Sequence, residues 1–125
     1  MSLKITGLAV AGACGALARY GLAGLLDRQM GSSFPWGTLA VNVAGCFLFG
    51  LIWTLTQERW LIGGEMRMIV LVGFVGSFTT FSAFLFETDQ MIEHAEWFMA
   101  SLNLAGELGL GLVAYLAGAF VGRLL

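Results

Sequence analysis

The sequence has few of the charged residues that a water-soluble protein needs. Of its 125 residues only 11% are charged, whereas 58% are hydrophobic, and the mean hydropathy is +0.86. A chain of this size cannot hide so much apolar surface in its own core, because small domains leave much of their surface exposed. The composition therefore predicts an integral membrane protein with a single domain.

Histidine, cysteine and basic residues are also scarce, and each shortage argues against a class of function. The six lysines and arginines form no cluster and the net charge is −2, so the basic surface that nucleic acid requires is missing. His94 is the single histidine, and Cys14 and Cys46 lie inside apolar runs, where cysteine usually acts as a small packing residue. These residues cannot supply a nucleophile, a base and an orienting group, so we expect neither an enzyme nor a disulfide framework.

Four apolar runs are long enough to cross the ~30 Å hydrocarbon core of a bilayer as helices. They are too long for the strands of a membrane barrel and lack alternating polarity, so the sequence predicts an all-α bundle of four transmembrane helices. We place the spans at about residues 3–26, 34–56, 68–86 and 98–124. Most basic residues then fall on the side of the two termini, a modest bias that still permits insertion in both orientations.

The third run has an unusual composition at residues 73–87. Two glycines, two adjacent threonines and two serines lie among five phenylalanines. Hydroxyl side chains can compete for backbone groups where glycine lets a helix open, so one interpretation is a helix broken near its middle. Such a break would mark an ion or substrate site, because irregular backbone at membrane depth must be buried or line a cavity. The other interpretation is an intact helix whose small residues only allow close packing.

Several polar residues lie within or at the ends of the predicted spans. Asn42 is either an interhelical hydrogen-bonding residue or a donor to a dehydrated anion. Glu107, on one face of the fourth span with Asn103, must be protonated, paired or water-exposed, and an intramembrane acid is a candidate functional residue. Arg19 either extends to the nearer membrane interface or attracts anions at a pore mouth. Glu87, at the end of the third run, is either a surface carboxylate or part of the site.

Small residues recur at four-residue spacing in the first and fourth runs, which predicts close helix contacts. They are Gly7, Ala11 and Gly15 in the first run and Gly118 and Gly122 in the fourth. Four packed helices fill their own centre with side chains, so a route for a solute must form between subunits, and we expect an oligomer. Because the sequence has no internal repeat, inverted symmetry would have to come from two copies inserted in opposite directions.

Three motifs resemble those of the small dual-topology fluoride channels, the Fluc or CrcB family. They are GACGALARY at residues 12–20, GTLAVNVAG at residues 37–45 and GFVGSFTTFSAF at residues 73–84. Each motif alone is weak, but together they are highly specific, and the resemblance covers essentially all four spans. It implies an antiparallel homodimer in the bacterial cytoplasmic (inner) membrane, which exports fluoride passively through two pores lined by both subunits.

The resemblance also implies roles for individual residues along the fluoride path. Phe81 and Phe84 match the pore phenylalanines, Asn42 matches the pore asparagine, and Ser82 and Glu87 match polar residues on the path. An aromatic ring has a positive edge, so two phenylalanines three positions apart on a helix can turn their edges toward an anion. The alternative role for the two phenylalanines is ordinary packing.

A central structural sodium ion is implied in the same way. Gly76 and Thr79 match the residues whose backbone carbonyls, from both subunits, hold this ion on the dimer axis. Family members tend to present hydroxyl side chains on the fourth helix, whereas this chain has Asn103, Glu107 and Gly111. The contribution of the fourth helix to the pore is therefore open.

A second hypothesis comes from the small multidrug exporters, which are also four-span, dual-topology dimers. They use a membrane-embedded glutamate to exchange protons for cationic compounds, and Glu107 invites the comparison. Their essential acid lies in the first helix, where this chain has none, and a broken, phenylalanine-rich third helix has no purpose in that scheme. A third possibility is a purely structural membrane subunit.

Overall fold

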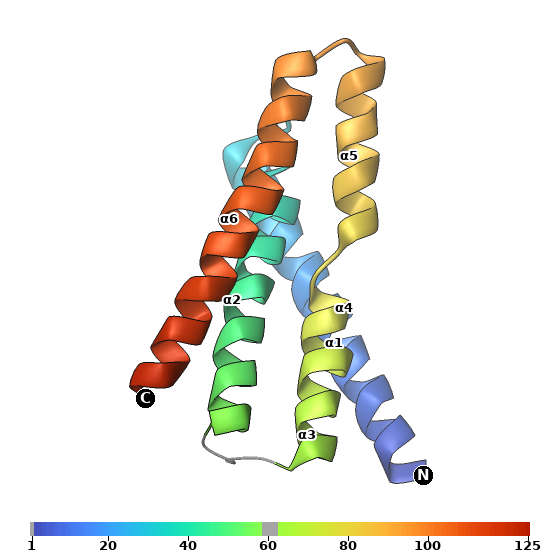
Figure 1. The fold of residues 1–125 in the computed structure, drawn as a ribbon. Coiled ribbons are helices and arrows are strands. Elements are labelled where there is room, and N and C mark those ends of the chain that lie inside the picture. Colours follow the sequence, from blue (N-terminus) through green and yellow to red (C-terminus); the bar gives the residue numbers. More distant parts are fainter. Residues whose placement is uncertain (1, 59–62) are drawn as a thin grey trace.

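The structure is a computed structural model that describes residues 2–58 and 63–125 (Figure 1). Within these ranges all regular structure is helical. Four segments are long and apolar enough to cross a membrane, Leu3–Met30, Trp36–Gln57, Gly64–Glu93 and Trp97–Leu124. These segments confirm the predicted all-α fold with four transmembrane helices, and both ends of the chain lie toward the same end of the bundle in Figure 1.

Three of the spans are continuous helices, α1 (Ser2–Met30), α2 (Trp36–Glu58) and α6 (Trp97–Leu124). Helix α1 was expected to end near residue 26, but it continues through Asp27 and ends where Gly31 adopts a positive φ of 84°. The Gly31 amide donates to the Asp27 carbonyl at 3.1 Å, as at many helix C-termini. Asp27 Oδ1 in turn accepts a 2.9 Å hydrogen bond from the Gly37 amide, which joins the end of α1 to the first turn of α2.

The third span is interrupted, which agrees with the broken helix and not with the intact helix of the two interpretations of its sequence. It consists of α3 (Gly64–Met68), a π-helical turn η1 (Ile69–Val75), α4 (Gly76–Phe78) and α5 (Phe81–Glu93). Thr79 and Thr80 between α4 and α5 have extended backbone, with φ/ψ of −84°/159° and −149°/114°. Gly76 has helical dihedral angles of −63°/−32°, so the change of backbone conformation occurs at the two threonines.

The third span is also longer than the predicted residues 68–86. It begins at Gly64 and continues to Glu93, so Asp89 and Glu93 lie on α5 and not between the third and fourth spans, as the predicted bounds would place them. The connection is the short segment from His94 to Glu96, which includes Ala95 with a positive φ of 58°. Charged residues at the end of a helix can face water or headgroups, which is why their presence does not mark where the helix ends.

Helix α2 lies at the centre of the bundle, and its main partner is α6. In the most apolar 18-residue stretch of each helix, 33% of the residues of α2 are buried within the chain, against 6% of those of α1. Gly50 of α2 packs on the Tyr115 carbonyl, and Gly118 of α6 packs on the Phe47 carbonyl, so a Cβ at either glycine would clash with backbone. Gly122 lies against Thr54, which confirms the close contact predicted for the glycine pair of the fourth run.

The small residues of α1 make the close helix contacts that were predicted, and the structure shows that their partner is the third span. A Cβ at Gly7 would lie 2.7 Å from the Ile69 side chain, and one at Gly15 would clash with the Phe74 carbonyl. Ala11 lies between them, against Gly73. The close approach of α1 supports the third span over the turns that precede the break.

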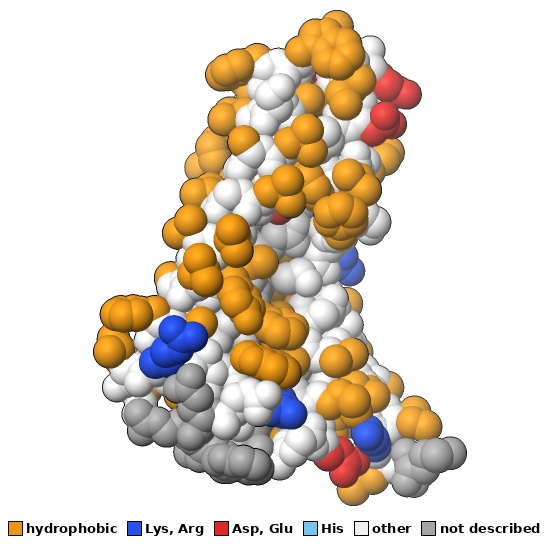
Figure 2. Space-filling model, in the orientation of Figure 1, with side chains coloured by type: hydrophobic (Ala, Val, Ile, Leu, Met, Phe, Trp, Pro, Cys, Tyr) orange, Lys and Arg blue, Asp and Glu red, His pale blue; other side chains and the backbone are white. Residues whose placement is uncertain are grey.

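Large apolar side chains cover much of the molecular surface (Figure 2). Leu108, Val113 and Phe120 on α6, for example, are 64%, 63% and 59% exposed in the single chain. Such a continuous apolar surface is stable in lipid or against another protein, not in water.

Candidate functional site

The break in the third span is formed by the two adjacent threonines. The Thr79 amide and the Thr79 hydroxyl both donate to the Val75 carbonyl, at 3.0 and 3.1 Å, which completes the last turn of α4. The Thr80 hydroxyl then accepts a 3.2 Å hydrogen bond from the Ala83 amide and acts as the N-cap of α5. At Thr80 the hydroxyl replaces a backbone acceptor that the break removes, whereas at Thr79 it adds a second donor to a carbonyl that keeps its helical amide partner.

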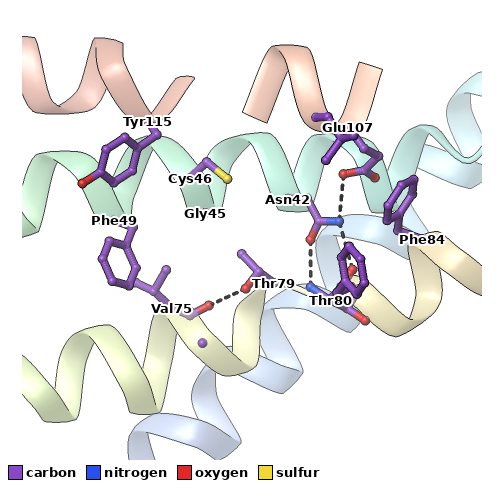
Figure 3. A pocket seen from close by; sticks show the side chains of 13 residues that line it. Asn42, Gly45, Cys46, Phe49, Val75, Thr79, Thr80, Phe84, Glu107 and Tyr115 are labelled. Carbon is purple, nitrogen blue, oxygen red and sulfur yellow. Dashed lines mark hydrogen bonds between the residues drawn. The ribbon is translucent and has the colours of Figure 1, made fainter. Parts of the chain in front are cut away.

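Asn42 of α2 braces this break from the side (Figure 3). Its Oδ1 accepts a 2.8 Å hydrogen bond from the Thr80 amide, and its Nδ2 donates to the Thr80 carbonyl at 3.0 Å. The side-chain amide thus pairs with Thr80 as a neighbouring backbone amide would. Gly45, one turn further along α2, makes the approach possible, because a Cβ there would clash with the Thr79 methyl group.

The break also changes the hydrogen bonding of two backbone carbonyls. In a continuous α-helix the Gly76 and Thr79 carbonyls would accept from the amides four residues later, those of Thr80 and Ala83. Here the Thr80 amide donates to Asn42, and the Ala83 amide donates to the Thr80 hydroxyl. The carbonyls of Gly76 and Thr79 have therefore lost the partners that a continuous helix would give them.

Glu107 of α6 joins the same network. Its Oε2 accepts a 3.0 Å hydrogen bond from Asn42 Nδ2, and the side chain is only 8% exposed (Figure 3). The other carboxyl oxygen, Oε1, is buried and has no hydrogen-bond partner. The sequence analysis left three alternatives for this acid, and in the single chain its burial argues against the water-exposed one, while an amide is its hydrogen-bond partner.

A pocket of about 450 Å³ opens beside the break. Its lining includes six residues that the sequence singled out, namely Asn42, Gly76, Thr79, Phe81, Phe84 and Glu107. It also includes residues to which the sequence assigned no role in the site, among them Cys46, Phe49, Thr80 and Tyr115. The second, third and fourth spans thus meet at one place, which is the position where the third span is broken.

Phe81 and Phe84, at the start of α5, form one wall of this pocket. Their ring centroids lie 5.4 Å apart and their planes are inclined at 62°, an edge-to-face arrangement. Phe84 is 3% exposed, whereas Phe81 is 66% exposed in the single chain. Phe84 is therefore held by the surrounding helices, while Phe81 lies on an open face of the pocket.

Glu87 lies in a second pocket, farther along α5. Its Oε1 accepts a 2.6 Å hydrogen bond from the Thr38 hydroxyl of α2, and its Oε2 is buried without a hydrogen-bond partner. The sequence suggested a carboxylate at a helix end, but α5 continues to Glu93, so Glu87 lies within the helix and is half-buried. The rest of this lining combines apolar residues, namely Phe34, Pro35, Phe86 and Met91, with polar and charged ones, namely Asp27, Ser32, Ser33, Gln90, His94 and Glu96.

Three other candidate residues lie outside both pockets. Ser82 is exposed, with its hydroxyl 3.3 Å from that of Thr80. Arg19 is half-buried on α1. Asn103 is fully buried between α6 and α5, where its Nδ2 donates to the Thr88 hydroxyl at 3.0 Å. The fourth helix therefore contributes Glu107 to the pocket at the break, but not Asn103.

Comparisons with known proteins identify the family of the chain. The family model described as CrcB-like protein, Camphor Resistance (CrcB), matches residues 6–119. A protein of Nitrosococcus oceani named fluoride-specific ion channel FluC is 51% identical over 122 residues, which is 98% of each chain. A protein with the same name from Desulforapulum autotrophicum is 49% identical over the full length of both chains. Another, from Geobacter sulfurreducens, is 47% identical over 95% of this chain and 96% of the relative. The chain therefore belongs to the CrcB-like family.

Proposed function

We propose that this chain is a fluoride-selective channel that lets fluoride leave the cell passively across the bacterial cytoplasmic membrane. The observation that carries the proposal is the convergence of Asn42, Phe81 and Phe84 on one pocket at a broken transmembrane helix. The relatives in the same family are named fluoride-specific ion channels. A channel performs no chemical conversion, so the proposal includes no enzymatic activity.

The chemistry of the pocket suits a small, strongly hydrated anion. A fluoride pathway must replace the water around the ion with several weak donors, because one strong site would trap it. Phe81 and Phe84 offer ring edges, which carry partial positive charge, and phenyl rings are chemically inert. Asn42 offers true N–H donors beside them.

We propose that the functional unit is a homodimer of antiparallel subunits in the lipid bilayer. Phe81 is 66% exposed, so the single chain leaves this wall of the pocket open. A second subunit packed on this face would close it, and the exposed apolar side chain of Leu108, which lines the same pocket, suits such a contact. A two-fold axis in the membrane plane would then produce two equivalent pathways, each lined by both subunits.

The residues at the break fit a structural sodium ion on the dimer axis. A hard cation binds oxygen ligands, and the carbonyls of Gly76 and Thr79 have lost their helical partners. Among the described residues, no group of three or more histidine, cysteine, aspartate or glutamate side chains could hold a metal ion, so such an ion would depend on these carbonyls. Two antiparallel copies would bring both carbonyl pairs to the axis, and the ion would supply a positive potential beside the anion pathway.

The exporter hypothesis finds no support in the site. Glu107 is hydrogen-bonded to Asn42 beside the broken helix, and it lies on the fourth span, not on the first. The positive ring edges of Phe81 and Phe84 would also have no use in a proton-coupled exporter of cationic compounds. The relatives from Nitrosococcus, Desulforapulum and Geobacter are all named as channels, not as exporters.

Release of fluoride from liposomes that contain the purified protein tests the proposal directly. The liposomes are loaded with equal concentrations of fluoride and chloride, and each ion is followed with its own electrode. We expect rapid release of fluoride and little release of chloride. Equal release of the two ions, or no release of either, would overturn the proposed function.

A further inference from the structure

Both N–H groups of the Asn42 side chain are engaged within the chain. One donates to the Thr80 carbonyl and the other donates to Glu107 Oε2, each at 3.0 Å. Under the proposed function Asn42 is a donor to the permeating anion. An amide nitrogen has only two hydrogens, so fluoride can receive one of them only if the Thr80 carbonyl or Glu107 gives it up.

Glu107 is the partner that is easier to displace. The Thr80 carbonyl lies in the backbone and is paired with Asn42 through two hydrogen bonds, whereas the carboxyl group is at the end of a flexible side chain. The carboxyl group also lines the pocket itself, with one buried oxygen that has no partner. Its hydrogen-bonded oxygen therefore takes the place that an anion on the Asn42 amide would take.

We propose that Glu107 is a tethered competitor for fluoride at the Asn42 amide. This inference rests on the proposed channel function. While the side chain is an anion, it holds the Asn42 N–H group and repels fluoride by its charge. When it accepts a proton from the aqueous phase, the neutral acid is a weaker acceptor, and its new O–H group can itself donate to the passing anion.

Fluoride conduction should therefore depend on pH, provided that no neighbouring charge neutralises Glu107. Among the described residues, the titratable groups that act on it are Cys46 on α2 and Glu87 on α5. Both are acids, so neither can hold the carboxylate in a salt bridge. On its own helix its neighbours at four-residue spacing, Asn103 and Gly111, are uncharged.

The test measures fluoride flux from proteoliposomes at several values between about pH 6 and about pH 8, the range in which a buried carboxyl group can titrate. Wild type is compared with Glu107→Gln, which keeps the shape without the charge, and with Glu107→Ser, which provides a hydroxyl. Glu65→Gln is the control, because it removes an exposed carboxylate outside the pocket. Liposomes without protein measure the leak of neutral hydrogen fluoride, and gel filtration measures the dimer content of each variant.

We expect wild-type flux to rise as the pH falls, and the Glu65→Gln profile to follow it. The Glu107→Gln and Glu107→Ser channels should have flat profiles, with flux near pH 8 on the order of tenfold above wild type, the ratio that corresponds to ~1.4 kcal/mol. Because a charged competitor weakens fluoride binding, both variants should also reach half-maximal flux at a lower fluoride concentration. If Glu107 served packing alone, the two substitutions would change neither the pH profile of the flux nor the fluoride concentration at half-maximal flux.

Two results would overturn the inference and leave the channel function intact. One is a wild-type fluoride flux that does not change with pH. The other is a Glu107→Gln channel with normal dimer content whose flux near pH 8, where wild type should be most inhibited, equals the wild-type flux or is lower. If neither wild type nor any variant released fluoride at any pH, the proposed function itself would fail, and the inference would fail with it.

Discussion

Replacing Asn42 with alanine removes three hydrogen bonds at once, two to the backbone of Thr80 and one to Glu107. Side-chain hydrogen bonds in membrane proteins contribute about 0.6 kcal/mol each on average and up to about 1.7 kcal/mol. Three such bonds correspond to about 2 to 5 kcal/mol. We therefore expect a large loss of stability, and a rearranged break in the variants that still fold.

Asn103→Ala is the matched control, because the chemical change is the same and the residue also lies within the bundle. Asn103 is fully buried but makes a single hydrogen bond, to the Thr88 hydroxyl, so its removal should cost about 1 kcal/mol. The difference in stability between Asn42→Ala and Asn103→Ala therefore measures the additional hydrogen bonds that Asn42 makes at the break. A third variant, Asn42→Asp, keeps an acceptor for the Thr80 amide, loses both N–H donors and brings a second carboxyl group next to Glu107.

Unfolding in a denaturing detergent measures the loss of stability, and fluoride flux from proteoliposomes measures the effect of a rearranged break on conduction. Asn42→Ala should unfold more readily than Asn103→Ala and should lose at least about tenfold in flux, since each ~1.4 kcal/mol in a barrier changes a rate by about that factor. Asn42→Asp should lose flux to a similar degree, because a charge that repels the anion replaces its donors. If Asn42→Ala were as stable as Asn103→Ala and conducted fluoride at the wild-type rate, Asn42 would neither brace the break nor donate to the anion.

Three further predictions concern the pore, the cation and the assembly. Phe81→Ile and Phe84→Ile should both sharply reduce fluoride flux in proteoliposomes. Only Phe84→Ile should also lower stability, because Phe84 is 3% exposed whereas Phe81 is 66% exposed. Wild-type flux in both variants would show that the rings serve only packing. Thr79→Ser should keep the proposed sodium site, because the ligand is a backbone oxygen and serine retains the hydroxyl bond to the Val75 carbonyl. Protein assembled with a larger cation in place of sodium should have a lower flux. A flux that does not depend on the cation would contradict the site. Cysteine or tag reporters at the C-terminus should be accessible from both sides of the membrane in one population of cells, and accessibility from a single side would exclude the antiparallel dimer.

The elements that the sequence predicted correctly are those with local signals. Length and hydropathy are properties of a continuous segment, so the four spans are recognisable without any knowledge of packing. The break is also local, because adjacent threonines near glycine offer the backbone alternative partners within a few residues. Helical spacing alone brings Asn103, Glu107, Gly111 and Tyr115 to one face, and in the structure the first three are buried and the last lines the pocket.

The pairings between spans could not be predicted from one sequence. Thr38 and Glu87 are 49 positions apart, and Asn42 and Glu107 are 65 positions apart, so nothing in their own segments indicates the partner. Which face of α2 meets which helix is decided by close backbone contacts, such as Gly45 against Thr79 and Gly50 against Tyr115. The end of α1 likewise does not coincide with the end of the apolar run, because the helix continues to Met30, just before Gly31, and Asp27 in its last turn accepts a hydrogen bond from Gly37 of α2.

The position of Glu107 shows why the fourth helix could not be assigned from the resemblance alone. A hydroxyl at this position would be neutral and could either donate or accept, so it would not compete with an anion for the Asn42 amide. An ionised carboxylate can only accept, and in this structure it accepts from the one side-chain amide that faces both the break and the phenylalanine pair. A chain with this acid must therefore either conduct fluoride mainly when the acid is neutral or move the side chain away from Asn42 for each ion. The two cases differ in their pH dependence, because displacement by the anion alone requires no proton.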